Sequence, residues 1–291
     1  MNLPVHFQRF LSNIEPTPNQ KEEAATGYLN LRSRLQEEDY AAYFDHSFVC
    51  GSYGRDIALQ TTKTVDVVVV ANYTASLWEP HVALSHLKRI LSKNCQTVTV
   101  QDNSIIIPLD TLELKIVPAI RTDDGFLKVP DKTSHSWVRS NARRHNQVSA
   151  AMDASKKGLY KPLVRALKYW RDHKMAEAWK AKSFLFECLV YDYAANSDFD
   201  SVAQGVEGFL WYIHSKYTPF RESHDCSPFI REIGATDVNV AKNWTYLEFC
   251  GFMDAVFKSW ILSRQAMEAQ SKIMSVDRWR QLFGDAFPSV T

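Results

Sequence analysis

The spacing of hydrophobic positions changes character about halfway along the chain. In the first half, short runs rich in β-branched residues, of which 64–71 is the clearest, alternate with helical patterns. Beyond about residue 140, almost every strong pattern repeats every 3.6 residues, which is typical of amphipathic helices. The pattern therefore predicts an α/β N-terminal part followed by an all-α C-terminal part.

The N-terminal part is predicted to form a sheet flanked by two helices. Thr17-Pro18-Asn19-Gln20 has the form of a helix start, with a hydroxyl N-cap, a proline in the first turn and a glutamine that completes a capping box. The helix that follows is expected to run to about Glu38, and a second one is expected over 78–92. The predicted strands are 47–50, 64–71, 96–101, 104–108 and 111–117, the last ending at Pro118.

The C-terminal part is predicted to be helical throughout. The polar segment 121–131 carries glycine and proline and is interpreted as the connection, with the boundary between about 130 and 146. The predicted helices are 141–155, 160–174, 183–195, 201–214, 238–271 and 275–283. We divide the chain into a core lobe, 1–135, whose N-terminal helix can pack on both lobes, and a helical lobe, 136–291. A cleft between two lobes is a common place for a ligand.

Composition places this chain among soluble globular proteins. Its 291 residues are 45% hydrophobic and 23% charged, which excludes a disordered chain. The five cysteines include no CxxC pair, and neither a secretion signal nor a long apolar segment is present. These features predict a cytoplasmic protein with reduced cysteines and no membrane association.

The small net charge of +1 hides a strong segregation of charge along the sequence. The segment 132–182 holds 13 Lys and Arg against three acidic residues, a net of +10, whereas the rest of the chain carries −9. A basic block in a well-packed protein indicates an anionic ligand such as phosphate, although a solvated helix face would look the same.

Candidate chemistry begins at Gly51-Ser52-Tyr53-Gly54-Arg55, which follows a predicted strand. Glycine lets a backbone approach a phosphate closely, and serine adds an N–H and a hydroxyl. On the next strand Thr64 and Asp66 face the same side, because side chains alternate with a period of two. A carboxylate at Asp66 could hold Mg²⁺ over a triphosphate.

The combination of these motifs resembles the nucleotidyltransferase superfamily, and the rest of the chain is similar to the bacterial cGAS/DncV-like nucleotidyltransferases, or CD-NTases. The further matching segments are Ile116-Val117-Pro118-Ala119, residues 163–171, Lys182-Ser183-Phe184 with Glu187, and residues 279–284 with Phe287-Pro288. The resemblance covers essentially the whole chain. It implies a two-lobed nucleotidyltransferase (polymerase β-like) fold, α/β plus all-α, with a mixed sheet in the N-terminal lobe and a helical C-terminal lobe.

The chain departs from the family pattern at two of three metal-binding carboxylates. Aligned on Asp66, the first aspartate position holds Thr64, and the third, three residues before Pro118, holds Lys115. The family's triad holds two Mg²⁺ ions, and the single remaining carboxylate would hold Mg²⁺ only weakly. An ammonium at ~4 Å opposes a metal by about 1 to 4 kcal/mol per unit charge, yet the same ammonium can meet a phosphate directly. Glu113, on the same strand face as Lys115, and Asp110 are the candidates for a replacement ligand.

The resemblance also assigns donor-phosphate contacts to the basic block. Lys161, Arg165 and Lys168 fall on one helical stripe beside an apolar one. The family places triphosphate contacts at the positions of Lys168 and Ser183; the alternative is a solvated stripe, with Ser183 as the N-cap of the next helix. Together with Gly51, Ser52, Arg55 and Arg165, these residues form the predicted nucleotide site.

Three hypotheses follow from these residues. The first is a catalytically degenerate CD-NTase that binds a nucleoside triphosphate or short oligonucleotide in the interlobe cleft, within bacterial anti-phage defence. The second is an active, metal-dependent nucleotidyltransferase that makes a cyclic or linear oligonucleotide messenger from nucleoside triphosphates and releases pyrophosphate. The third is a scaffold that binds a defence-system effector protein without any ligand.

Overall fold

The computed structural model describes residues 1–72, 78–93, 97–122, 126–131, 136–175, 179–234 and 237–290, with only the backbone of Glu38 and Asp39. The chain folds into two compact units. The sheet unit is Pro16–Gln147, and the helical unit combines Met1–Glu15 with Val148–Thr291.

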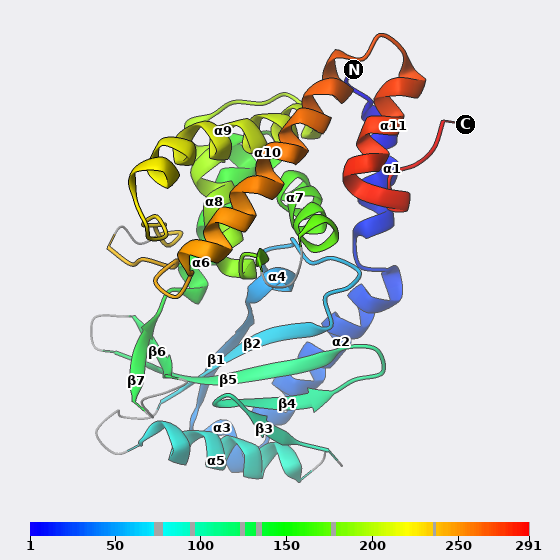
Figure 1. Cartoon of the computed structure of the whole chain (residues 1–291). Helices are drawn as coiled ribbons and strands as arrows, with labels where there is room; N and C mark the ends of the chain where they lie inside the picture. Colours follow the sequence, from blue (N-terminus) through cyan, green and yellow to red (C-terminus); the bar gives the residue numbers. More distant parts are fainter. Residues whose placement is uncertain are drawn as a thin grey trace. The chain divides into compact units, whose positions relative to one another are not determined.

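The sheet unit is built on one mixed seven-stranded sheet (Figure 1). Its strands are β1 (Phe44–Val49), β2 (Thr64–Ala71), β3 (Thr99–Gln101), β4 (Ser104–Pro108), β5 (Glu113–Arg121), β6 (Leu127–Pro130) and β7 (Trp137–Ser140). The main path runs β1-β2-β5-β4-β3, and β6 joins β5 to β7. The pair β2 and β5 is parallel, and the other pairs are antiparallel. The predicted mixed sheet is therefore confirmed.

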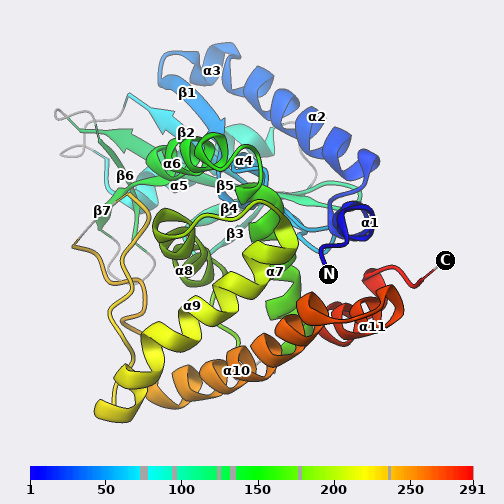
Figure 2. The same ribbon diagram turned by 90° about the horizontal axis from the view of Figure 1, so that it is seen from above.

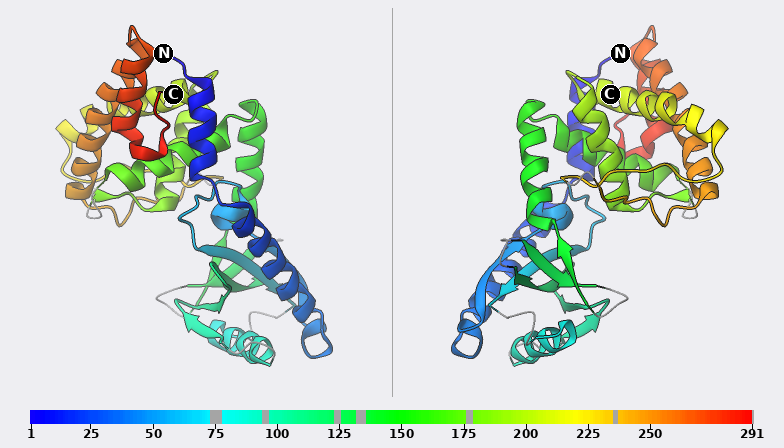
Figure 3. Two further views of the ribbon diagram at one scale, coloured as in Figure 1. Left: turned by 90° about the vertical axis from the view of Figure 1, so that its right-hand side faces the viewer. Right: turned by 90° about the vertical axis from the view of Figure 1, so that its left-hand side faces the viewer.

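The two faces of this sheet are covered differently. The valines at odd positions of β2 pack with α2 (Pro18–Leu35) and α5 (Pro80–Ser92) in the larger core of the unit. The ribbons of these two helices, α2 in blue and α5 in blue-green, can be followed in Figure 3. On the other face Val68 and Val70 pack with Ala119, Leu127 and Ala142, the first residue of α6 (Ala142–Ser155). The short helices α3 (Glu38–Ala41) and α4 (Gly51–Gly54) flank β1 in sequence. The face of Val68 and Val70 is also the face of Thr64 and Asp66, because all four positions are even.

The helical unit contains α1 (Pro4–Ile14), α7 (Tyr160–Lys174), α8 (Ser183–Asn196), α9 (Val202–Ser223), α10 (Tyr246–Glu268), α11 (Lys272–Phe283) and the 3₁₀ turn η2 (Gly284–Ala286) (Figure 2). Its core is rich in aromatic residues, and Trp170 and Trp279 are fully buried. Leu163, Leu167 and Trp170 form the buried stripe of α7, as the sequence predicted. No described helix is long and apolar enough to cross a lipid bilayer.

Several boundaries differ from the prediction. Strand β5 passes through Pro118, which lies between the part paired with β4, ending at Ile116, and the part paired with β6, starting at Ile120. On its other side Pro118 stays in the parallel register, opposite Val69 of β2, so the break concerns only the side of β4 and β6. Predicted strand residue 96 lies outside the described residues.

The segment predicted to connect the lobes instead forms β6, and β7 follows it. Leu127 of β6 is 8% exposed and packs with Val68 and Val70, so this hairpin belongs to the sheet unit. The division of the chain accordingly falls after Gln147 rather than after residue 135.

Helix ends were predicted less accurately where a capping residue, and not the hydrophobic period, sets the end of the helix. Helix α10 starts at Tyr246, not 238, because Thr245 and Glu248 form a capping box. Helix α9 continues to Ser223 through Pro219, beyond the predicted end at 214. Helix α1 was not predicted, although Phe7, Phe10 and Ile14 give it a buried stripe at helical spacing; it packs in the helical unit, where Phe7 lies 5.0 Å from Trp279 between ring centroids.

Candidate functional site

The turn after β1 is shaped by two glycines. Gly51 has φ of +62°, which favours glycine, and it opens the single helical turn α4. A Cβ on Gly54 would lie 2.4 Å from the carbonyl oxygen of Val49, so only glycine allows this close approach. The same carbonyl accepts a hydrogen bond of 2.9 Å from Asn146 Nδ2, which ties α6 to the turn. The backbone of the predicted phosphate loop is thus held tightly at both ends.

Asp66 lies directly against this turn. A Cβ on Gly51 would be 2.1 Å from Asp66 Oδ2, and the backbone N–H of Cys50 donates to the carbonyl oxygen of Asp66 at 2.8 Å. Burial, followed by the nearby Asp66 charge, raises the pKa of the Cys50 thiol to about 12. Cys50 is therefore a protonated structural residue at neutral pH and not a nucleophile. Ser52 is half-buried and Arg55 is buried. Both residues follow Gly51 in the turn that lies against Asp66 of β2.

The parallel register of β2 and β5 determines which side chains meet. Thr64 pairs with Glu113, and Asp66 pairs with Lys115. All four residues are half-exposed, whereas their neighbours Val65 and Leu114 are buried, so the four share the open face of the sheet. The Thr64 hydroxyl donates a 2.8 Å hydrogen bond to Glu113 Oε1. Along this face the Thr64 hydroxyl is therefore bonded to the Glu113 carboxylate, and two residues further along the Asp66 carboxylate has the Lys115 ammonium as its strand partner.

Divalent metal ions, which the family implies, do not fit this arrangement. Two Mg²⁺ ions need several anionic oxygens, but Asp66 has an ammonium as its strand partner and Glu113 is engaged by Thr64. Among the described residues, no group of three or more His, Cys, Asp or Glu side chains is placed to hold a metal. Among the same residues Lys115 makes no direct ion pair, so its ammonium is not held by a carboxylate.

The remaining predicted residues lie in the helical unit. Lys168 is 3% exposed, and its Nζ lies 3.5 Å from Oε1 of Glu187, which is 2% exposed. Lys161 and Arg165 of the same helix are half-exposed. The alternative of a solvated stripe is therefore wrong at Lys168, because this residue is buried beside the buried carboxylate of Glu187 on α8. The phosphate contact expected of Lys168 stays a prediction.

Ser183 is exposed in the first turn of α8, but Lys182 is the N-cap and no side chain caps the helix. The suggested N-cap role of Ser183 is therefore wrong. Its hydroxyl accepts instead from Nη1 of the buried Arg171 at 3.1 Å. The guanidinium of Arg171 also donates to Asp172 Oδ1 and lies 5.5 Å from the Phe186 ring centroid. Sequence reasoning placed Arg171 in a family motif but missed this contact, which its position three residues after Lys168 could have suggested.

The predicted site residues therefore form two groups. Gly51, Ser52, Arg55, Thr64, Asp66 and Lys115 come together at one end of the sheet unit. Arg165, Lys168 and Ser183 lie on α7 and in the first turn of α8, in the helical unit. The nucleotide-binding role of both groups, and the cleft between the lobes, stay predictions.

Comparison with known families assigns the class of protein that this fold and these motifs define. Residues 1–152 match the Second Messenger Oligonucleotide or Dinucleotide Synthetase domain, and residues 147–261 match the cGAS/DncV-like nucleotidyltransferase C-terminal helical domain. The chain belongs to the bacterial cGAS/DncV-like nucleotidyltransferase family. The predicted family and the predicted two-part nucleotidyltransferase fold are both confirmed.

Relatives among the cyclic oligonucleotide synthases match over nearly the whole chain. A cyclic AMP-AMP-AMP synthase from an Acinetobacter species is 24% identical and is aligned over 99% of this chain and 86% of its own length. A cyclic AMP-AMP-GMP synthase from Enterobacter hormaechei is also 24% identical, over 99% of this chain and 92% of its own length.

Solved structures support the fold. The E. coli CdnC structure with ATP has a TM-score of 0.81 at 18% identity and covers 99% of both chains. The Bradyrhizobium diazoefficiens CdnG structure in complex with GTP has a TM-score of 0.75 at 13% identity and covers 97% of this chain and 94% of that one. E. coli CdnC has also been solved in a complex with a HORMA protein, again with a TM-score of 0.81, 17% identity and 98% of both chains covered.

Proposed function

We propose that this chain binds the phosphate groups of a nucleoside triphosphate or short oligonucleotide and does not catalyse nucleotidyl transfer. The observation that carries the proposal is the register pairing of Lys115 with Asp66, which puts an ammonium where the family has a carboxylate. A positive charge at this place opposes a metal ion but attracts a phosphate directly. The tightly held Gly51 turn beside Asp66 is kept, which supports phosphate binding.

The family resemblance also assigns phosphate contacts to residues of the helical unit. Lys168 and Ser183 would contact the phosphate chain, and Arg165, half-exposed on the same helix as Lys168, would add charge. Because Lys168 is paired with Glu187, its contact with a ligand would have to share the ammonium between a carboxylate and a phosphate. The relatives with bound ATP and GTP support a nucleotide as the ligand.

We propose anti-phage defence as the setting of this function, because membership of this family implies it. An effector or accessory protein is the proposed macromolecular partner, and the relative solved with a HORMA protein supports this.

Binding without metal and without turnover is the direct test. Titration of ATP into the protein in EDTA should give measurable heat. Adding Mg²⁺ should strengthen the affinity by no more than roughly twofold, because Asp66 has Lys115 as its strand partner and Glu113 accepts from Thr64. Incubation with all four nucleoside triphosphates and Mg²⁺ or Mn²⁺ should release no pyrophosphate above a protein-free blank. Failure to bind any nucleotide or oligonucleotide in either buffer contradicts the proposal.

One observation favours the second candidate, an active synthase with an altered metal site. Glu113 Oε1 lies 2.8 Å from Thr64 Oγ1, so a carboxylate is present beside the altered position. If this site were active, Glu113 and Asp66 would be its metal-binding carboxylates, and Glu113→Gln and Asp66→Asn would each lower the rate of pyrophosphate release at least about 100-fold. Wild-type turnover that survives both changes would exclude catalysis at this site and point to a contaminant.

A further inference from the structure

Next to Asp66 and Lys115 on the open face of the sheet unit, three planar groups stack on one another: the rings of His46 and Phe48 and the guanidinium of Arg143. Phe48 of β1 pairs with Val68, which lies two residues after Asp66 on the same face. Two residues along a strand span roughly 6–7 Å, so this stack is the next level of the same face. The His46 ring lies on Phe48 at 6.1 Å with an interplanar angle of 18°, and the Arg143 guanidinium lies 5.0 Å from the Phe48 centroid.

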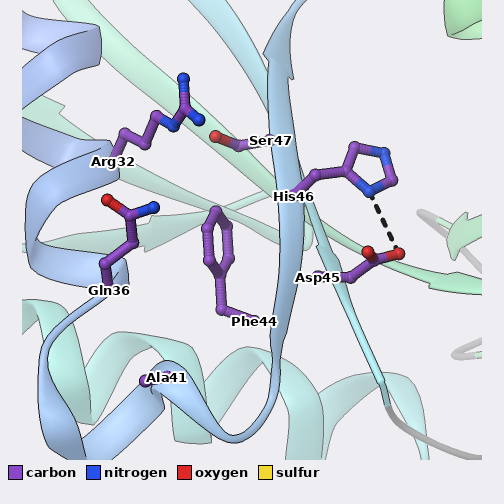
Figure 4. A pocket seen from close by; sticks show the side chains of 7 residues that line it. All are labelled: Arg32, Gln36, Ala41, Phe44, Asp45, His46 and Ser47. Carbon is purple, nitrogen blue, oxygen red and sulfur yellow. Dashed lines mark ion pairs between the residues drawn. The ribbon is translucent and has the colours of Figure 1, made fainter.

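Arg143 is held in this place by a chain of polar contacts. Its Nη2 lies 2.6 Å from His46 Nε2, and because a guanidinium can only donate, Nε2 must be the unprotonated acceptor. His46 Nδ1 therefore carries the proton and donates to Asp45 Oδ2 at 3.1 Å; Figure 4 shows this pair on β1. Asp45 Oδ2 also accepts from Arg121 at 2.6 Å, so its charge is already shared.

The result is an exposed cation with a restrained side chain. Arg143 is exposed, and among the described residues no carboxylate lies within ion-pair distance of it. A flexible surface arginine loses rotamer freedom when it binds, whereas one fixed by an aromatic ring and a histidine has lost it beforehand. A restrained guanidinium without a carboxylate partner is suited to a phosphate group.

We propose that Arg143, positioned by His46 and Phe48, is a second phosphate-binding group, and that the ligand of this chain is an oligonucleotide rather than a mononucleotide. The inference rests on the proposed function, which places the first phosphate at Lys115. A single nucleoside triphosphate presents one contiguous phosphate chain, whereas an oligonucleotide presents phosphates separated by a nucleoside and can reach two levels of the sheet face. The ring of Phe48 and the guanidinium of Arg143 also offer planar surfaces on which a base can stack.

The test compares two fluorescent ligands in EDTA by fluorescence anisotropy. One is a 3′-fluorescein-labelled pool of 5′-phosphorylated RNA dinucleotides, and the other is a labelled pool of nucleoside triphosphates, each containing all four bases so that base preference does not decide the result. Arg143→Gln should weaken binding of the dinucleotide pool roughly tenfold and binding of the triphosphate pool less than about twofold.

Positioning variants and a matched control separate this role from general charge. His46→Leu removes the acceptor and should weaken dinucleotide binding about threefold or more, whereas His46→Gln keeps a carbonyl acceptor and should recover part of the loss. The matched control is Arg89→Gln, which removes an exposed arginine from α5 on the other face of the sheet and should leave both affinities unchanged.

The outcomes distinguish this inference from the proposed function. If both pools bind but Arg143→Gln affects them equally, or no more than Arg89→Gln does, Arg143 is not a second phosphate group and only the proposed function survives. If neither pool binds the wild-type chain, the proposed function fails and the inference fails with it. A selective loss of dinucleotide binding supports both.

Discussion

Lys115→Asp should weaken binding of ATP in EDTA by at least about 30-fold. Asp66 and the new carboxylate would be strand partners on one open face, so the change replaces an attraction for phosphate with a repulsion. A change of two unit charges near a phosphate is worth about 2 kcal/mol or more at the effective dielectric of a protein surface. Calorimetry of the wild type and the variant in the same buffer measures the effect.

The same variant should respond to Mg²⁺ in the opposite way from the wild type. Two adjacent carboxylates can share a divalent cation, so Mg²⁺ should recover much of the lost affinity. Arg89→Asp makes the same charge change on the opposite face of the sheet and should alter affinity less than about twofold. Equal affinity of wild type and Lys115→Asp in EDTA would show that Lys115 does not contact the ligand.

Lys168→Met should lower the free energy of unfolding by about 3–5 kcal/mol, because it leaves the carboxylate of Glu187 buried without its ammonium. Urea denaturation followed by circular dichroism measures the loss. The double variant Lys168→Met with Glu187→Leu removes both charges and should recover most of the stability. Lys161→Met, a half-exposed position on the same helix, should change stability by less than about 0.5 kcal/mol.

The double variant also separates a structural role of Lys168 from a ligand role. A stable double variant that no longer binds ATP supports the phosphate contact proposed for Lys168. A stable double variant with wild-type affinity would leave Lys168 as a structural residue only. A Lys168→Met variant as stable as the wild type would contradict the buried ion pair.

Local patterns were sufficient for much of the fold. The strand 64–71 and the helix 160–174 were predicted with the bounds that the structure shows, since their side-chain periodicity is strong and uninterrupted. The capping box at Thr17 and Gln20 was also predicted correctly, because capping depends on four neighbouring residues. The passage of β5 through Pro118 was not predictable, because it depends on which neighbouring strand pairs at each position.

For the candidate site, the sequence by itself determined which chemical groups are available. It showed the Gly51 turn, the single remaining aspartate at Asp66, and the threonine and lysine at the two altered positions. These identities follow from motif spacing, which is local information. The register of β2 and β5, which makes Glu113 the partner of Thr64 and Lys115 the partner of Asp66, was decided by the tertiary structure.

Contacts between distant segments also decided which basic side chains are paired within the protein. The helical period put Lys168 on a basic stripe, but Glu187, 19 residues away, pairs with it in the interior. The chain through Asp45, His46 and Arg143 likewise joins residues 97 positions apart, and no pattern in the sequence connects them. Local sequence determines which faces and motifs exist, whereas contacts between distant segments determine which charges are neutralised within the protein and which are left for a ligand.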